Sequence, residues 1–386
     1  MLGAGRTVTG MTEPIRVARI ESVRLRAEAS RLPSSSLGAM RARNGLLVKV
    51  EDADGAFGWG EVWCNSPPHA AESRQQLLET VIAPELVGER FAHPRQVRPS
   101  LEARWTRMAT HVGEPGPFGH CIAGIDMAVW DLQARRRGRP LSALLNGSPD
   151  DSVRVYASTL DPARAPALAG ELVAAGHDAF KLKVGHDAQR DEALVRSMRE
   201  AIGAAPAILV DANQSWSVAE AATAINRLAR HGVSFAEEPL SALTPVEDWI
   251  DLAGQTDVPL AAGENICSEA QYDAHVAAGA LTFYQPDVAK WGGVGGCAAV
   301  GRLVVGRGLA YCPHFMGTAV GLAASLHLLA AVGGPGFVEL DSNPNPLRTA
   351  LCDLDLGVSD GRVRVPTSPG IGVVPDGAAL REYQMT

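Results

Sequence analysis

A repeating strand-and-helix unit dominates the second part of the chain and constrains its fold. From about residue 152 onward, short apolar runs alternate with stretches rich in Ala and Leu that are typical of helices. The runs are VRVYAST, AFKLKVG, ILVDANQ, SFAEEPL, PLAAGEN, TFYQPDVAK, LAYCPHF and FVELDS, beginning at residues 153, 179, 208, 234, 259, 282, 309 and 337. Strands that alternate with helices form parallel sheets. The pattern therefore predicts an α/β fold, with a closed parallel barrel of the (β/α)8 type over residues 149–356.

A polar or charged residue stands near the carboxyl end of each run from the second onward. Seven such residues recur every 23 to 28 positions: Lys183, Asp211, Glu237, Glu264, Asp287, His314 and Glu339. The carboxyl ends of successive barrel strands meet at one mouth, where barrel enzymes carry their active sites. Because all seven are of types used in catalysis, we expect them to form an active site.

Three of these residues suggest a metal ion. Asp211, Glu237 and Glu264 lie on three neighbouring predicted strands, and crowded carboxylates raise each other's pKa unless a cation neutralises them. Ligation by oxygen alone favours Mg²⁺ over zinc. Of the adjacent pair Glu237 and Glu238, only one is expected to point inward, because the side chains of a strand alternate between its faces. The other is expected to be a structural acceptor.

Two further groups have the chemistry of bases. Lys181 and Lys183 are two residues apart in an apolar strand and are expected to share a face, where like charge lowers the pKa of both and suits one to act as a neutral base. His314 lies near the carboxyl end of the run LAYCPHF, and Asp287 lies near the end of the run before it. That carboxylate is expected to fix the imidazole tautomer and to raise its basicity.

The N-terminal part predicts a separate α+β domain over residues 15–148. Two apolar runs on either side of Asp54-Gly55 indicate a β-hairpin in an antiparallel sheet. Residues 70–137 are expected to be mainly helical. Residues 1–14 are expected to be frayed, and residues 357–386 are expected to form a C-terminal segment.

Composition and charge exclude several classes of function. The longest apolar stretches are shorter than the roughly 18 residues that a membrane span needs, so no membrane partner is expected. Lys and Arg number 35 against 43 Asp and Glu, without a basic stripe, so no nucleic-acid partner is expected. The six cysteines contain no C-x-x-C, and the first dozen residues lack the apolar run of a secretory signal. We expect a reduced, cytoplasmic protein.

The motifs of the chain resemble those of the enolase superfamily, in its mandelate racemase subgroup. The matching segments are KLK (181–183), DAN (211–213), EEP (237–239), GEN (263–265), QPD (285–287), KWGG (290–293), His314, Glu339, GWGE (58–61) and GIDMAVWDL (124–132). The resemblance implies a modified TIM barrel, (β/α)7β, under an N-terminal α+β capping domain that the C-terminal segment completes. The branch of muconate-lactonizing enzymes is disfavoured, because it has a lysine in place of Asp287.

The resemblance also implies a role for each site residue. One Mg²⁺ is held by Asp211, Glu237 and Glu264. Lys183 is one base, and the His314–Asp287 dyad is the other, on the opposite face of the substrate. Glu339 is the electrophilic partner of a substrate carboxylate oxygen, and Lys181 and Asn213 are supporting groups. Lys290 is interpreted as structural.

The reaction shared by the family is abstraction of the proton alpha to a carboxylate, giving an enediolate. Two polar cap segments, RLPSSSLGAMRARN (31–44) and WCNSPPH (63–69), are placed where family members close over the ligand. Ser34, Arg41 and Asn65 are therefore expected to bind a small polyhydroxylated carboxylate. This favours dehydration of a sugar acid, an aldonate or aldarate, to a 2-keto-3-deoxy acid. A racemase or epimerase of a 2-hydroxy acid, a sugar-acid lactone cycloisomerase and a non-catalytic barrel that binds a carbohydrate acid stay open, and a homo-oligomer is expected.

Overall fold

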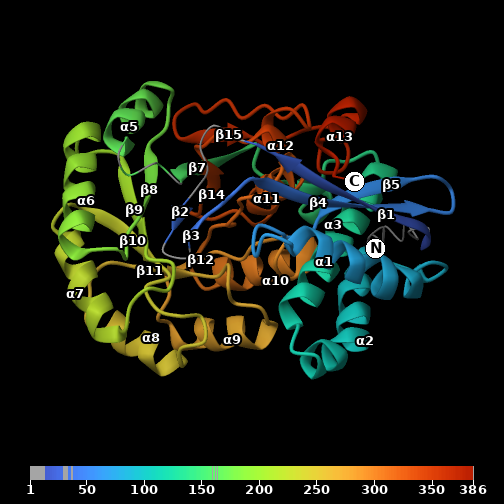
Figure 1. The fold of residues 1–386 in the computed structure, drawn as a ribbon, viewed down its shortest axis with the longest axis horizontal. Coiled ribbons are helices and arrows are strands. Elements are labelled where there is room, and N and C mark those ends of the chain that lie inside the picture. Colours follow the sequence, from blue (N-terminus) through green and yellow to red (C-terminus); the bar gives the residue numbers. More distant parts are fainter. Residues whose placement is uncertain are drawn as a thin grey trace, which may run out of the picture.

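The computed structural model describes residues 14–28, 34–35, 38–158, 160, 162 and 164–385 (Figure 1). Apart from Pro14, the segment predicted to be frayed, 1–14, lies outside the described residues. Within those ranges, no helix combines the length and the apolar character needed to cross a membrane. Figure 1 shows a barrel on the left and a capping domain on the right, with α10 and α11 between them.

The barrel has eight parallel strands in the part of the chain that the structure describes. They are β7 (Ser152–Ser158), β8 (Ala179–Lys183), β9 (Ala207–Asp211), β10 (Val233–Glu237), β11 (Leu260–Ala262), β12 (Phe283–Tyr284), β13 (Ala310–Tyr311) and β14 (Val338–Asp341). The connecting helices are α5 (Ala165–Ala174), α6 (Ala188–Ile202), α7 (Val218–Ala229), α8 (Val246–Ala253), α9 (Glu269–Ala278), α10 (Gly293–Gly306) and α11 (Ala319–Val332).

The strands pair in chain order from β7 to β13, and β14 lies beside β7. A hydrogen bond of 3.4 Å from the Glu339 amide to the Pro313 carbonyl spans the seam between β14 and the segment after β13. This order confirms the (β/α)7β barrel.

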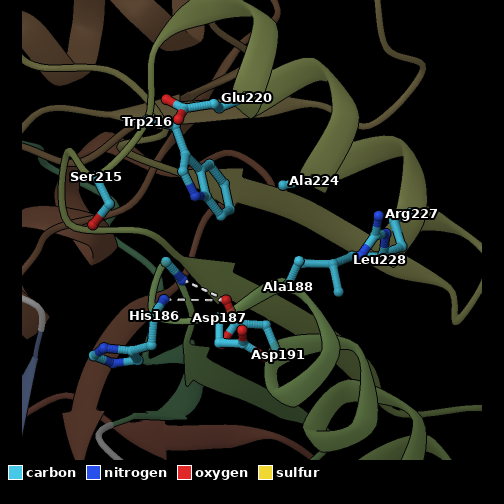
Figure 2. Close-up of a pocket in the computed structure, with 11 residues that line it drawn as sticks. His186, Asp187, Ala188, Asp191, Ser215, Trp216, Glu220, Ala224, Arg227 and Leu228 are labelled. Atoms are coloured by element: carbon cyan, nitrogen blue, oxygen red, sulfur yellow. Dashed lines mark hydrogen bonds between the residues drawn. The ribbon is translucent and has the colours of Figure 1, made fainter.

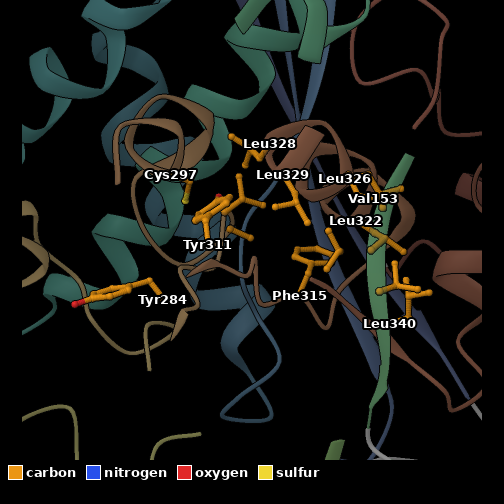
Figure 3. Packing of buried hydrophobic residues seen from close by; sticks show 14 of the residues in the cluster. Val153, Tyr284, Cys297, Tyr311, Phe315, Leu322, Leu326, Leu328, Leu329 and Leu340 are labelled. Atoms are coloured by element: carbon orange, nitrogen blue, oxygen red, sulfur yellow. The ribbon is translucent and has the colours of Figure 1, made fainter. Parts of the chain in front are cut away.

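Apolar side chains fill the barrel beneath its mouth. Tyr156, Phe235 and Phe337 are buried in the interior, and the ring of Tyr156 contacts each of the two phenylalanine rings edge to face. On the outside, α11 is buried on every face from Ala319 to Ala331, as a helix between two domains must be. Figure 3 shows its leucines packed with Phe315 and Leu340. The mouth of the barrel therefore lies above a packed apolar interior and beside a fully buried helix.

The capping domain is an antiparallel sheet covered by helices. Its strands run in the order β5 (Phe57–Glu61), β4 (Arg43–Asp52), β1 (Ile15–Ala27) and β6 (Arg90–Phe91). The turn between β4 and β5 confirms the predicted hairpin. The helices are α1 (Ala70–Leu77), α2 (Val97–His111) and α3 (Pro115–Arg136). A Cβ at Gly58 or Gly60 would collide with the backbone of α3, so these glycines allow β5 to lie directly on that helix.

The remaining elements are short. They are β2 (Ser34–Ser35), β3 (Gly38–Ala39), α4 (Leu141–Leu145), α12 (Pro346–Thr349), β15 (Arg362–Arg364) and α13 (Gly377–Tyr383), with η1 (Leu78–Ile82), η2 (Ala83–Glu85) and η3 (Pro94–Gln96) in the cap. β15 pairs antiparallel with β7, and the Met385 amide donates to the Arg24 carbonyl at 3.0 Å. The C-terminal segment thus returns to the cap, while the domain limits at 148 and 356 stay predictions.

Candidate active site

The mouth of the barrel brings together side chains from β8 to β14. The register aligns three of them directly, since Lys183 of β8 pairs with Asp211 of β9, and Asp211 pairs with Glu237 of β10. The others follow β11, β12 and β13 or lie on β14, and they are Glu264, Asp287, His314 and Glu339. The carboxyl ends of parallel strands share one rim, which is why residues far apart in the chain meet here.

Lys181 lies at the centre of an ionic network. Its side chain is 1% exposed, and its Nζ lies 2.8 Å from both carboxylate oxygens of Glu237 and 2.9 Å from Oε1 of Glu339. The same Nζ lies 3.5 Å from Oδ2 of Asp211, which also accepts from Lys183 at 2.5 Å. Each of the two lysines therefore contacts a carboxylate predicted to bind the metal ion.

The two lysines remain charged in this arrangement. Burial lowers the pKa of Lys183, but Asp211, with help from Glu237 and Glu339, outweighs burial and the like charge of Lys181. The pKa of Lys183 is therefore raised. The pKa of Lys181 is raised well above its ordinary value, because the same carboxylates, Glu237 first, outweigh its burial. The prediction that like charge lowers the pKa of both lysines is wrong. It took no account of the carboxylates that contact each ammonium group and raise its pKa.

The carboxylates respond to the lysines in different ways. Burial and then Asp211 raise the pKa of Glu237 to about 7. Burial also acts to raise the pKa of Asp211, but Lys183 and Lys181 outweigh it and lower that pKa. Among the predicted metal ligands, Glu237 thus shows the expected effect of crowding, whereas ammonium groups neutralise the charge of Asp211.

Glu238 belongs to the same cluster, although the sequence predicts that only one residue of the pair points inward. It follows the end of β10 with a φ of 39°, which breaks the alternation of strand side chains. Burial, then Glu264 and Asp211, raise its pKa to about 8. Both of its carboxylate oxygens lie 2.9 Å from Nδ2 of Asn265, which donates to them. The predicted structural acceptor is confirmed, but the prediction of opposite faces is wrong.

His314 and Asp287 form the predicted dyad. Nδ1 of His314 lies 2.7 Å from Oδ2 of Asp287, and both side chains are buried. Nε2 lies 3.6 Å from Oε2 of Glu264 and 3.5 Å from Oε2 of Glu339, so it faces the carboxylate cluster. Burial lowers the pKa of the imidazole, but Glu264, Glu339 and Asp287 outweigh it and raise the pKa to about 10. The expected gain in basicity is confirmed.

Glu339 is ionised in this arrangement. Burial acts to raise its pKa, but Lys181 and His314 outweigh burial and lower it. An ionised carboxylate accepts hydrogen bonds and donates none. The role expected for Glu339, that of an electrophilic partner, therefore requires a proton that its neighbours do not favour here.

Lys290, interpreted as structural from the sequence, also reaches the mouth. Its Nζ lies 2.8 Å from Oε2 of Glu264 and 2.7 Å from Oδ1 of Asn265. It also lies 4.9 Å from the centroid of the Trp63 ring, which comes from the cap. The signal that could have revealed this role is its place three residues after Asp287, at the same carboxyl end of β12.

The predicted substrate-binding residues lie in different surroundings. Asn213 follows β9, and its backbone amide donates to Oδ1 of Asp211 at 2.8 Å. Nδ2 of Asn65 donates to the Met316 carbonyl at 3.0 Å, so this amide holds the loop after His314. Arg41 is exposed. The side chain of Ser34 lies outside the described part of the chain.

Two family models match the chain. The N-terminal domain of mandelate racemase / muconate lactonizing enzyme matches residues 20–146, and the enolase C-terminal domain-like family matches residues 164–379. The chain belongs to the enolase superfamily, in its mandelate racemase subgroup. The match confirms the resemblance of the motifs.

Characterised relatives in the superfamily catalyse two kinds of reaction. A D-galactarolactone cycloisomerase from Agrobacterium fabrum is 31% identical over 88% of this chain and 91% of its own length. A D-galactonate dehydratase from Ralstonia nicotianae is 30% identical over 87% of this chain and 90% of its own. The chain is accordingly an enzyme of the lyase or isomerase type.

Solved structures of the superfamily share the whole fold. A mandelate racemase/muconate lactonizing enzyme from Bordetella bronchiseptica is 44% identical, with a TM-score of 0.89 over 96% of this chain and 99% of that one. A racemase from Streptomyces coelicolor with bound magnesium is 28% identical, with a TM-score of 0.85 over 96% of this chain and all of that one.

The donor set at the mouth fits the Mg²⁺ of an enolase-superfamily enzyme in its chemistry. Asp211, Glu237 and Glu264 offer carboxylate oxygens alone, the ligands that hard divalent ions take. In the ranges that the structure describes, however, no three Asp, Glu, His or Cys side chains are arranged as a group that could hold a metal ion. Lysine ammonium groups contact each of the three carboxylates instead. To bind the ion, the carboxylates must give up these contacts.

The cavity drawn in Figure 2 is separate from this mouth. It has a volume of about 260 Å³ and lies between α6 and α7, with Trp216, Glu220 and Arg227 among its lining residues. None of the carboxylates of the mouth lines it. Asp191, at its base, accepts hydrogen bonds from the backbone amides of Gly185 and His186 and so supports the loop that follows Lys183.

Proposed function

We propose that the enzyme dehydrates a sugar acid, an aldonate or aldarate, to a 2-keto-3-deoxy acid. The observation that carries the proposal is the presence of two acid–base groups at one mouth. Lys183 ends β8, and His314, bonded to Asp287, follows β13, with β9 to β12 between them in the sheet. One group can accept the α-proton while the other delivers a proton to a leaving group.

The proposed reaction assigns a task to each group. Nζ of Lys183, once neutral, takes the proton from the carbon alpha to the substrate carboxylate. Nε2 of His314, in the imidazolium form that Asp287 stabilises, protonates the departing β-hydroxyl, which leaves as water. The resulting enol loses the proton of its C2 hydroxyl and gains one at C3 to give the keto acid. Glu339, in its protonated form and with Lys181 beside it, is the proposed partner of a substrate carboxylate oxygen.

We further propose that Asp211, Glu237 and Glu264 hold one Mg²⁺. When bound, the ion supplies positive charge beside the substrate carboxylate as negative charge develops there. Asn213 supports Asp211 through its backbone amide. The Mg²⁺ in the racemase from Streptomyces coelicolor supports this assignment.

A sugar-lactone cycloisomerase is the second candidate. It is favoured by the D-galactarolactone cycloisomerase, which is 31% identical to this chain. The first step would be the same, but the leaving group would be the ring oxygen of the lactone and not a hydroxide. The D-galactonate dehydratase favours the first candidate at 30% identity.

Incubation with the aldonate and aldarate diastereomers and, separately, with their lactones, in D₂O with Mg²⁺, decides between the candidates. Dehydration is expected to give a keto acid that semicarbazide detects, and Lys183→Ala and His314→Asn are each expected to abolish it. Each variant should still exchange the α-proton of the substrate configuration that the remaining base faces. Epimerised or ring-opened product, without keto acid from any acyclic acid, would refute the dehydratase.

A further inference from the structure

Both members of the dyad lie just before a barrel helix whose N-terminus is held by the cap. Asp287 precedes α10, and His314 precedes α11. In each case the backbone amides at the helix N-terminus donate to a buried carboxylate of the capping domain. These two carboxylates are Asp126 of α3, which is 0% exposed, and Glu61 of β5, which is 3% exposed.

Glu61 holds the N-terminus of α11 with both of its oxygens. Oε1 accepts from the Thr318 amide at 2.8 Å, while Oε2 accepts from the Thr318 hydroxyl at 2.7 Å and from the Gly321 amide at 3.0 Å. A carboxylate at this position also interacts favourably with the helix dipole. A Cβ at Gly317 would collide with Glu61, so the glycine makes room for the contact.

The short segment between His314 and Thr318 is fixed along its whole length. Met316 accepts a hydrogen bond from Nδ2 of Asn65, and Gly317 accepts one from Nδ2 of Asn345 at 2.9 Å. Phe315 is buried among the leucines of α11 (Figure 3). We therefore expect a shift of Thr318 to reach the backbone of His314 through this short segment.

Asp126 acts in the same way on α10. Its Oδ2 accepts from the Gly295 amide at 2.7 Å. The N-cap residue of α10, Gly292, has no side chain that could cap the helix itself. A Cβ at Gly293 would lie 2.6 Å from Oδ2 of Asp126, so here too a glycine makes room. The Lys290 and Trp291 amides donate to the Asp287 carbonyl at 3.1 Å, which makes the connection to Asp287 compact.

From this geometry we infer that Glu61 and Asp126 are positioning residues. Through them, the capping domain sets the position of His314 relative to Asp287. Each carboxylate holds the helix that follows one member of the dyad. Docking of the cap therefore brings the imidazole of His314 and the carboxylate of Asp287 into their 2.7 Å contact. The inference rests on the proposed function only in assigning catalytic work to the dyad. The geometry of the dyad itself is independent of the reaction.

Asp131 provides a matched control on the same helix. It is 0% exposed, and its carboxylate accepts from the amides of Trp59 at 2.8 Å and Ile371 at 2.7 Å and from Nε of Arg135 at 2.8 Å. It therefore holds the hairpin and the C-terminal segment, not a helix that follows the dyad. Asp131→Asn should lower the melting temperature as Glu61→Gln and Asp126→Asn do, because each removes a buried hydrogen-bonded carboxylate.

The test uses protein labelled with ¹⁵N-histidine, in which the Nδ1 and Nε2 signals of His314 are assigned by their loss in His314→Asn. Glu61→Gln and Asp126→Asn are expected to shift or broaden these signals, whereas Asp131→Asn is expected to leave them at their wild-type positions. With an acid that the wild type turns over, the first two variants should lose kcat by about ten- to a hundredfold, while KM changes by less than about threefold.

Unchanged ¹⁵N signals in both Glu61→Gln and Asp126→Asn would overturn the inference, as would equal shifts in Asp131→Asn. The spectra decide the matter even if no sugar acid is turned over, in which case only the proposed function fails. If Glu61→Gln does not fold, Thr318→Val replaces it. This change removes the hydrogen bond from the Thr318 hydroxyl to Glu61, together with the bond that this hydroxyl accepts from the Val320 amide, without setting a new donor against the carboxylate. A wild-type spectrum in Thr318→Val, with wild-type kcat, would then refute the role of Glu61.

Discussion

Replacing Asp287 with Asn should disable the imidazole of His314 while leaving the loop in place. Oδ1 of Asp287 accepts from the amides of Ala289 at 2.8 Å and Lys290 at 3.2 Å, whereas Oδ2 contacts His314. In Asp287→Asn, the two amides retain the carbonyl oxygen, so the new NH₂ group faces Nδ1. Two donors cannot pair, and the imidazole proton must move to Nε2.

The loss follows from the position of that proton. Nε2 faces Glu264 and Glu339 at 3.6 and 3.5 Å and is the atom proposed to exchange a proton with the substrate. A histidine in the wrong tautomer, beside a neutral partner, typically costs about 10⁴-fold in kcat. This corresponds to about 5 kcal/mol in the activation barrier.

The assay compares kcat, α-proton exchange in D₂O and melting temperature for Asp287→Asn, His314→Asn and the double variant. We expect Asp287→Asn to approach the activity of His314→Asn and the double variant to lose little more, because residues that act as a unit are not additive. The substrate configuration that faces Lys183 should still exchange. Retention of more than about a tenth of kcat in Asp287→Asn, or losses that multiply in the double variant, would refute the reasoning.

Three further predictions concern a metal ligand, the buried ion pair of Arg43 and a buried carboxyl group. Asp211→Asn should weaken Mg²⁺ binding by more than about tenfold in calorimetry, because it removes a charged ligand, and unchanged affinity would contradict the assignment. Arg43 and Asp341 form an ion pair of 2.6 Å in which each side chain is 2% exposed. Arg43→Met removes this partner of Asp341 and should lower the free energy of unfolding, measured in urea, by about 3–5 kcal/mol. A loss below about 1 kcal/mol would count against a strong pair. Burial raises the pKa of Glu61 from 4.5 to about 7. As the pH rises between these two values, the free energy of unfolding of the wild type should fall relative to that of Glu61→Gln, by up to about 3 kcal/mol. Parallel curves of unfolding free energy against pH would exclude the shift.

The strand periodicity of the sequence was sufficient to predict which residues gather at the mouth of the barrel. Lys183, Asp211 and Glu237 are separated in the chain by whole strand-and-helix units, and in the structure they are direct partners across β8, β9 and β10. The reason is that a parallel barrel converts sequence spacing into a position on the rim. The hairpin around Gly55 was predictable on similarly local grounds.

Charge states depended on the tertiary structure, because they sum contributions from several strands. Two lysines on one strand suggest a lowered pKa, yet Glu237 and Glu339, from β10 and β14, reverse the sign for Lys181. Glu238 appeared to point away from the cluster until its φ of 39° at the strand end turned it inward. Neither effect has a signature in the local sequence.

The sequence by itself determined the barrel, its cap and the residues that gather at its mouth, because strand and helix lengths are local properties that repeat along the chain. Only the tertiary structure decided which groups carry charge and what holds the dyad in place. Glu61 and Asp126 lie in motifs that the sequence marks, but their partners Thr318 and Gly295 are more than 160 residues away. Docking of the cap on α10 and α11 makes these contacts, and no local pattern encodes that docking.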